Sequence, residues 1–193
     1  YYRFVNEAVR EHMGGLHSAR VLLYSVDFHE VELLQRAAAW DEAGRLLGQS
    51  ARSLEAAGAD FLVLCTNTMH KVADAIVAAV HVPLLHIADP TAEAVKAAGC
   101  AKVGLLGTRF TMEEDFYRER LRRNHGLEVL VPGREDRDAV HRVIYNELCL
   151  GRVLPESRAQ YRRIMADLVG RGAQAIILGC TEISLLVDDS DAS

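Results

Sequence analysis

Two periodicities of apolar residues alternate along the chain. Segments with an apolar residue every three to four positions predict helices at residues 1–11, 40–57, 69–80, 91–98, 113–123, 138–148 and 156–171. Short continuous apolar runs between them predict strands at residues 21–25, 61–64, 84–87, 103–106, 128–131 and 175–178. Alternation of helices with buried strands predicts an α/β fold with mainly parallel sheets and helices on both faces.

One local pattern, an apolar run followed by a Cys-Thr pair, occurs twice in the chain. Cys65 and Cys180 each follow a short apolar run and are each followed by threonine. The distance from Tyr2 to Cys65 equals that from Tyr117 to Cys180, 63 residues in both cases. A Gly-Ala pair precedes each run, although the glycine-to-cysteine spacing is 7 residues in one copy and 8 in the other. We therefore expect a duplicated half, with residues 1–97 as one α/β half and 98–193 as the other.

Comparison of the two halves also predicts missing elements at both ends. In the second half, the strand 103–106 precedes the helix that carries Tyr117, whereas the first half begins inside the corresponding helix. The repeat argument predicts that roughly fifteen residues, including a first strand, are absent before residue 1. It also predicts that a closing strand and helix are absent after residue 193.

The two cysteines are the candidate catalytic residues. Ligands in parallel α/β sheets bind at the carboxyl ends of the strands, where both Cys-Thr pairs fall. Two thiols on opposite faces of one carbon suit racemisation, because a thiolate removes the Cα proton and a thiol returns one to the other face. We expect the following helix start to favour the thiolate, with one thiolate and one thiol at rest. The alternative is that both are small buried hydrophobic residues.

Polar residues near the cysteines are the candidate substrate contacts. Their hydroxyls, amide and helix-start N–H groups suit a carboxylate, and Ser25 follows a predicted strand. The candidates are Thr66, Asn67, Thr68, Thr181, Thr108 and Ser25. For Asn67 and Thr68 the alternative is a helix cap with no other role.

These segments resemble a known family. Residues 64–71 (LCTNTMHK) and 178–183 (LGCTEI) are similar to the two signature segments of the cofactor-independent aspartate/glutamate racemases. Residues 14–19, 25–28, 106–112 and 147–151 resemble the broad-specificity amino-acid racemase branch. The resemblance implies two flavodoxin-like domains related by a pseudo-two-fold axis, with the active site in the cleft between them. There the sulfurs of Cys65 and Cys180 should lie roughly 7–10 Å apart.

The resemblance also implies an amino-acid substrate, no cofactor and a possible homodimer. Members specific for acidic amino acids use basic residues at positions near Val31 and Leu150, which are apolar here. This difference favours neutral or mixed side chains. The alternatives are a strict aspartate/glutamate racemase, a hydantoin racemase, a maleate isomerase and, in a different class, an inactive α/β ligand-binding module.

Composition argues against several other classes of protein. The 193 residues are 50% hydrophobic and 25% charged, enough for a substantial core. The net charge of −5 and the lack of a basic cluster argue against nucleic acid. The apolar runs are too short to span a membrane and no leader is visible, which indicates a cytoplasmic protein. The 4 cysteines, widely spaced, indicate reduced thiols.

The remaining candidates favour structural roles. Cys65 and His70 alone are too few ligands for a metal site, so we expect no metal. His86 is expected to be a hydrogen-bonded strand residue, and Cys100 and Cys149 to be packing residues. No lysine lies in a setting that resembles a pyridoxal-phosphate site.

Overall fold

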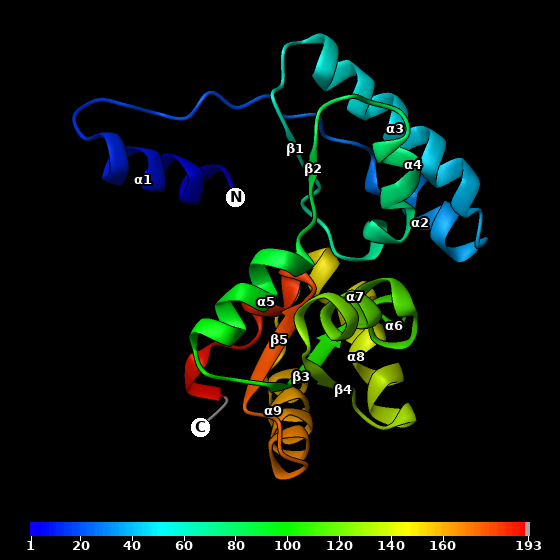
Figure 1. Cartoon of the computed structure of the whole chain (residues 1–193). Helices are drawn as coiled ribbons and strands as arrows, with labels where there is room; N and C mark the ends of the chain where they lie inside the picture. Colours follow the sequence, from blue (N-terminus) through cyan, green and yellow to red (C-terminus); the bar gives the residue numbers. More distant parts are fainter. Residues whose placement is uncertain (192–193) are drawn as a thin grey trace. The chain divides into compact units, whose positions relative to one another are not determined.

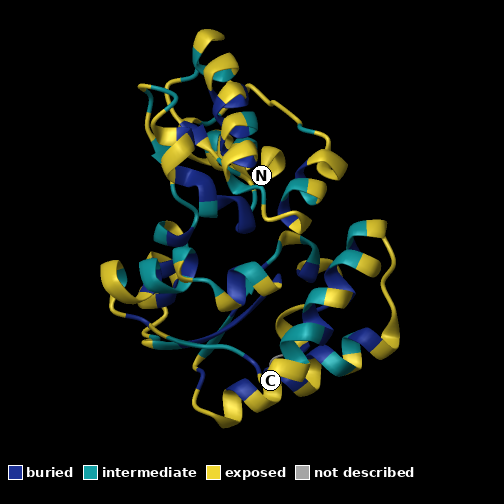
Figure 2. Cartoon of the chain, turned by 90° about the vertical axis from the view of Figure 1, so that its right-hand side faces the viewer, coloured by how far each residue is buried: buried dark blue, intermediate teal, exposed yellow. Residues whose placement is uncertain are grey.

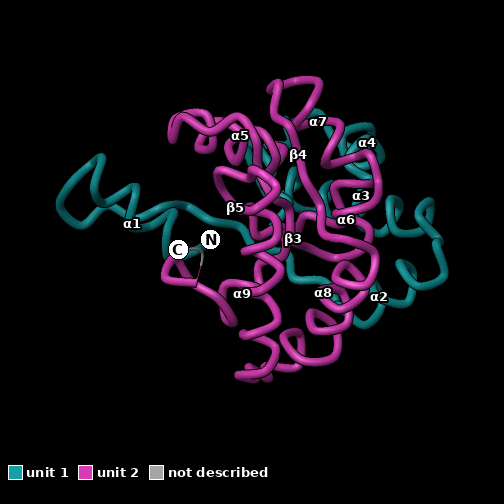
Figure 3. Tube along the Cα trace, turned by 90° about the horizontal axis from the view of Figure 1, so that it is seen from below, with its two compact units in different colours: residues 1–65, 72–85 teal, residues 66–71, 86–193 magenta. Residues whose placement is uncertain are grey.

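The computed structural model describes residues 1–191, which form two compact units (Figure 3). Unit 1 contains Tyr1–Cys65 and Val72–Leu85, and unit 2 contains Thr66–Lys71 and the chain from His86 onward. The boundaries of these units differ from those of the predicted halves, 1–97 and 98–193. The two halves remain a prediction from the sequence repeat. The helix α5 (Ala88–Ala97), placed in the first half by that prediction, packs within unit 2.

Unit 2 is built on a parallel sheet. Its strands are β3 (Lys102–Gly107), β4 (Glu128–Leu130) and β5 (Ala175–Gly179), in the order β4-β3-β5 (Figure 1). Both pairings of the central strand β3 are parallel, and its last residue, Gly107, pairs with Gly179. The expected α/β fold with parallel strands is confirmed.

Helices cover both faces of this sheet. They are α5, α6 (Arg109–Glu113), α7 (Asp115–His125), α8 (Arg134–Asn146) and α9 (Pro155–Gly170), with 3₁₀ turns η2 (Leu148–Leu150), η3 (Thr181–Leu185) and η4 (Asp189–Asp191). Val103 and Leu105 of β3 pack with residues of α5 and α7, whereas Leu106 packs with α8 and α9. Successive side chains of a strand point to opposite faces, so the continuous apolar run at 103–106 serves two cores.

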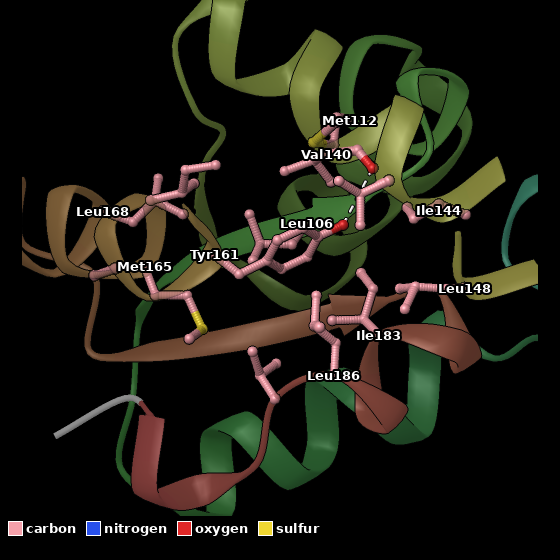
Figure 4. Packing of buried hydrophobic residues seen from close by; sticks show 14 residues of the cluster. Leu106, Met112, Val140, Ile144, Leu148, Tyr161, Met165, Leu168, Ile183 and Leu186 are labelled. Carbon is pink, nitrogen blue, oxygen red and sulfur yellow. Dashed lines mark hydrogen bonds between the residues drawn. The ribbon is translucent and has the colours of Figure 1, made fainter. Parts of the chain in front are cut away.

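The larger core surrounds Tyr161 of α9 (Figure 4). Its ring is fully buried, and its hydroxyl donates a hydrogen bond of 3.1 Å to the carbonyl oxygen of Val140. Leu106, Met165 and Ile183 pack around it. Ile183 belongs to η3, so the turn that follows Cys180 is anchored in this core.

Unit 1 has little sheet. It contains α1 (Tyr2–Met13), α2 (Phe28–Arg36), α3 (Trp40–Ala56) and α4 (Ala73–Val77), with β1 (Leu62–Val63) and β2 (Leu84–Leu85) paired in parallel. The 3₁₀ turn η1 (Thr68–Val72) joins β1 to α4. No residue of α1 is buried, and Tyr2 is 71% exposed, whereas Tyr117, its predicted equivalent, is 1% exposed.

Several predicted elements differ from those observed. Residues 21–25 form no strand, and the apolar side chains there are exposed, since an apolar run becomes a strand only with a partner for its backbone groups. The predicted helix 69–80 is divided into η1 and α4. The predicted helix 113–123 is preceded by α6 and interrupted at Glu114, whose backbone is extended. The helix α2 was not predicted.

Burial in unit 2 follows the expected amphipathic pattern. Figure 2 shows buried positions on the inner sides of the helices and exposed positions on their outer turns. Within residues 1–191, no helix combines the length and apolar character needed to cross a membrane.

The crowding at Gly104 leads to a stability prediction. A Cβ atom there would lie 2.6 Å from Cδ1 of Ile176 and 3.0 Å from Cδ1 of Leu168. Gly104→Ala should lower the free energy of unfolding by about 1 kcal/mol, because the side chains of Ile176 and Leu168 must move aside. In urea unfolding followed by circular dichroism, the midpoint should decrease. The control is Gly170→Ala in α9, where a Cβ meets nothing within 4 Å and should not destabilise. Equal midpoints for the two variants would contradict the prediction.

Candidate functional site

The two Cys-Thr pairs have the same local structure. Cys65 follows β1 and precedes η1, and Cys180 follows β5 and precedes η3. Upstream, α3 and α9 both end at a left-handed glycine, Gly58 with φ 94° and Gly172 with φ 96°. Each glycine is followed by an alanine whose N–H bonds back to the helix. Because only glycine adopts this φ readily, the repeated Gly-Ala pair seen in the sequence has a backbone cause.

The carboxyl edge of the unit 2 sheet brings Thr108 and Cys180 together. Gly107 pairs with Gly179, so the next residues, Thr108 and Cys180, leave adjacent strands at the same level. A Cβ atom on Gly179 would lie 2.9 Å from the carbonyl oxygen of Leu106. Glycine is therefore required for the close approach of backbones at this edge.

Three threonine hydroxyls meet at this edge. Oγ1 of Thr68 lies 2.8 Å from Oγ1 of Thr108 and 3.4 Å from that of Thr111, and the last two are 3.2 Å apart. All three side chains are buried. Thr108 also caps α6, because its hydroxyl accepts a bond from the Thr111 N–H. Thr108 is therefore both a helix cap and a member of this hydroxyl cluster.

His70 holds the segment Thr66–Lys71 in place. Nδ1 of the His70 ring lies 2.7 Å from the carbonyl oxygen of Thr66, and Nε2 accepts a hydrogen bond of 3.2 Å from the Ile87 N–H. This network assigns the proton to Nδ1, and burial lowers the pKa of His70. Both nitrogens are thus used in backbone hydrogen bonds rather than free for a metal. Among residues 1–191, no three histidine, cysteine or acidic residues are grouped as a metal site.

His86 stacks beside His70, with ring centroids 4.3 Å apart. Its Nδ1 accepts from the Ala88 N–H at 3.2 Å, at the start of α5. Burial lowers the pKa of His86 to about 4, and His70 and Arg120 act in the same direction. His86 is hydrogen-bonded as expected from the sequence, but it follows β2 and does not lie in a strand.

Cys180 is a hydrogen-bonded thiol. Its Sγ donates to Oε2 of Glu182 at 2.9 Å, and the hydroxyl of Thr181 donates to the same oxygen at 3.0 Å. Burial, followed by the Glu182 carboxylate, raises the pKa of Cys180 far above its usual range. The expectation that the strand end lowers the pKa of this thiol is wrong. The turn η3 has only 5 residues, so its dipole is weaker than burial and the neighbouring carboxylate.

The other predicted thiol, Cys65, belongs to unit 1. It is exposed, and its Sγ lies 3.9 Å from the carbonyl oxygen of Val63. Partial desolvation raises its pKa as well, again opposite to the expected direction. Ser25 is also in unit 1, exposed and outside regular structure. Val31 is buried in α2, and Leu150 of unit 2 is 63% exposed.

The candidates Thr66, Asn67, Thr68, Thr108, Cys180 and Thr181 thus belong to unit 2. Sequence reasoning missed Thr111 and Glu182 as members of this group. Thr111 stands three residues after Thr108, the spacing of a helix cap, and Glu182 stands two residues after Cys180. Cys149, predicted as a packing residue, does pack against the Tyr161 core. Burial, followed by the charge of Glu182, raises the pKa of its thiol to about 11.

Comparison with solved structures gives the class of protein. A crystal structure from Yersinia pestis, provisionally assigned as an Asp/Glu racemase, matches with a TM-score of 0.91 and 57% identity. An aspartate racemase homologue from Pyrococcus horikoshii OT3 matches with a TM-score of 0.80 and 34% identity. Each match covers 100% of this chain and 84% of the other. The fold is therefore shared with racemase-like α/β proteins.

The family model for Asp/Glu/Hydantoin racemase matches residues 1–193. The chain belongs to the Asp/Glu/hydantoin racemase family. The broad specificity amino-acid racemase RacX of Bacillus subtilis (strain 168) is 28% identical over 151 residues, which are 77% of this chain and 63% of RacX. This chain thus spans less than two thirds of RacX.

The lowered pKa of His86 predicts acid sensitivity. His86 binds a proton near pH 6.5 in the unfolded chain and only near pH 4 in the folded chain. The contribution of neutral His86 to stability is therefore complete above pH 6.5 and is lost as the pH falls toward 4. His86→Asn keeps an acceptor for Ala88 without titrating. It should reduce the loss of unfolding free energy between pH 7 and pH 4 by about 2 kcal/mol, a figure discounted for partial exposure.

The measurement is urea unfolding at each pH. The control is His17→Asn, which replaces an exposed histidine. A His86→Asn variant with the acid sensitivity of the wild type would contradict this role for His86.

Proposed function

We propose that this chain carries the acid/base residues of an amino-acid racemase that uses no pyridoxal phosphate or other cofactor and no metal. Cys65 and Cys180 are the pair. The observation that carries the proposal is the repeated local unit of a glycine-ended helix, a strand, a Cys-Thr pair and a 3₁₀ turn. Membership of the racemase family supports it.

The chemistry requires one proton to leave and another to arrive. The thiolate of one cysteine takes the Cα proton, and the thiol of the other gives its proton to the opposite face. Afterwards the first sulfur is a thiol and the second a thiolate, so the pair is ready for the opposite enantiomer. The intermediate carbanion needs fixed hydrogen-bond donors that are arranged before the reaction.

The segment after Cys65 carries candidate substrate contacts. Thr66–Lys71 is bonded directly to Cys65 and yet belongs to unit 2, where Thr68 joins the hydroxyl cluster of Thr108. We propose that Thr66, Asn67, Thr68, Thr108 and Thr181 bind the substrate carboxylate and ammonium groups, with Ser25 contributing from unit 1.

We propose broad specificity for amino acids with neutral or mixed side chains. The name of RacX and the apolar residues Val31 and Leu150 support this choice. A small-molecule amino acid is the only partner the mechanism requires. A homodimer and a cytoplasmic location remain expectations from the sequence.

The test is solvent exchange. Protein carrying this chain is incubated in heavy water with a panel of L- and D-amino acids, and deuterium at Cα is followed by NMR with optical rotation. Exchange accompanied by inversion for several neutral amino acids is expected. Exchange confined to aspartate or glutamate would indicate a strict racemase, and activity only on a hydantoin or on maleate would indicate another activity. Binding without exchange would indicate an inactive module.

Single replacements of the thiols test the pair. Cys65→Ser and Cys180→Ser should each lower racemisation by at least about 10²-fold, since a hydroxyl is a poor acid and base near neutral pH. With a leaving group at Cβ, a remaining thiolate can still remove the proton and allow elimination, so the two variants should prefer opposite enantiomers.

The control replacement is Cys100→Ser, because Cys100 lies outside the Cys-Thr segments. It should retain wild-type racemisation. Near-wild-type activity in both of the other variants would mean that the cysteines are only packing residues.

A further inference from the structure

We propose that Glu182 is a positioning residue that keeps Cys180 in the thiol form at rest and returns its proton when Cys180 has acted as the acid and no substrate of the opposite hand has been bound. This inference rests on the proposed racemase function and goes further, because it gives the two sulfurs different resting states. Cys180 is then the acid at rest, and Cys65, whose own segment carries no such carboxylate, is the thiol that ionises more readily and acts as the base.

The geometry around Glu182 carries the proposal. Oε2 accepts from the Sγ of Cys180 at 2.9 Å and from the hydroxyl of Thr181 at 3.0 Å. Two donors on one oxygen fix the carboxylate beside the sulfur. Glu182 is itself only half-buried, so it can exchange protons with water while it holds the thiol.

The two Cys-Thr segments carry different polar residues two positions after the cysteine. Glu182 stands two residues after Cys180, whereas Asn67 stands two residues after Cys65. An amide cannot supply a negative charge or exchange a proton. Sγ of Cys65 lies 3.9 Å from the carbonyl oxygen of Val63. The carboxylate therefore acts on only one thiol of the pair.

The backbone N–H of Glu182 favours the Cys180 thiolate and lowers the pKa of the thiol, but burial and the carboxylate of the same residue outweigh it. Cys149 on η2 and Tyr161 on α9 interact electrostatically with Cys180. Glu147 accepts a hydrogen bond from Ser157 at 2.5 Å and adds another negative charge near Tyr161. None of these groups is a cation, and the carboxylates Glu147 and Glu182 oppose a further negative charge at this edge.

The proton balance is simple. When Cys180 protonates Cα, its S–H bond breaks and a thiolate is left beside the Glu182 carboxylate. Repulsion between the two anions favours uptake of a proton by Glu182 from water. Transfer of that proton to sulfur forms the S–H bond again and leaves the carboxylate. Cys65 releases its proton to water, so no net proton is consumed.

The experiment compares Glu182→Gln with wild type by two measurements. The first is the rate of iodoacetamide alkylation of each cysteine between pH 6 and pH 10, followed by mass spectrometry. Loss of the charge should speed alkylation of Cys180 about tenfold at pH 8, equivalent to ionisation one pH unit lower. Cys65 in the same sample should be unchanged. Glu182→Asp keeps the charge, so its alkylation rate should stay closer to that of the wild type. The control Glu135→Gln removes an exposed carboxylate of α8 and should have the wild-type alkylation rate.

The second measurement is the pH profile of Cα exchange. Glu182→Gln should lower kcat about tenfold with little change in KM, and the alkaline limb should move down by about one pH unit, because both thiols then ionise together. Unchanged Cys180 alkylation, or a uniform loss of kcat with an unshifted profile, would overturn the role of Glu182. A wild type without Cα exchange would overturn the racemase proposal, while the alkylation rates would still decide whether Glu182 holds the Cys180 thiol.

Discussion

The parallel pairing of β3 with β5 is the constraint on which the candidate site depends. Its register ends with Gly107 opposite Gly179, so Thr108 and Cys180 leave the sheet side by side. Neighbouring strands lie about 4.8 Å apart, which brings residues distant in sequence within the reach of one small molecule. A shift of one residue would point each side chain to the opposite face and separate the group.

Burial then decides the chemistry at this edge. The core around Tyr161 includes Ile183, three residues after Cys180, and so fixes the turn that carries the thiol. The same core removes water from the sulfur, which favours the neutral thiol over the thiolate. A short 3₁₀ turn offers too small a dipole to reverse this effect. The Glu182 carboxylate acts in the same direction and completes the environment of a proton donor.

The hydroxyl cluster shows how a cap can become part of a site. Thr108 caps α6 as its sequence context indicates, but the cluster with Thr111 also receives Thr68 from the segment after Cys65. Two backbone hydrogen bonds to His70 hold that segment. Histidine has a structural role here because both ring nitrogens are already used and burial keeps the ring neutral.

The sequence by itself determined the strands and the longer helices of unit 2 and the positions of the two cysteines. Apolar runs that are buried on both faces, such as 103–106, are strands because their pattern is set locally by side-chain alternation. The glycines that end α3 and α9, Gly58 and Gly172, could likewise be recognised in the sequence, since a left-handed turn favours glycine wherever it occurs. Tertiary structure decided the rest. The run 21–25 has the composition of a strand but no pairing partner, and strand pairing is a long-range property. The pKa of Cys180 and the roles of Glu182 and Thr111 depend on burial and on neighbours brought together by folding, which no local pattern encodes.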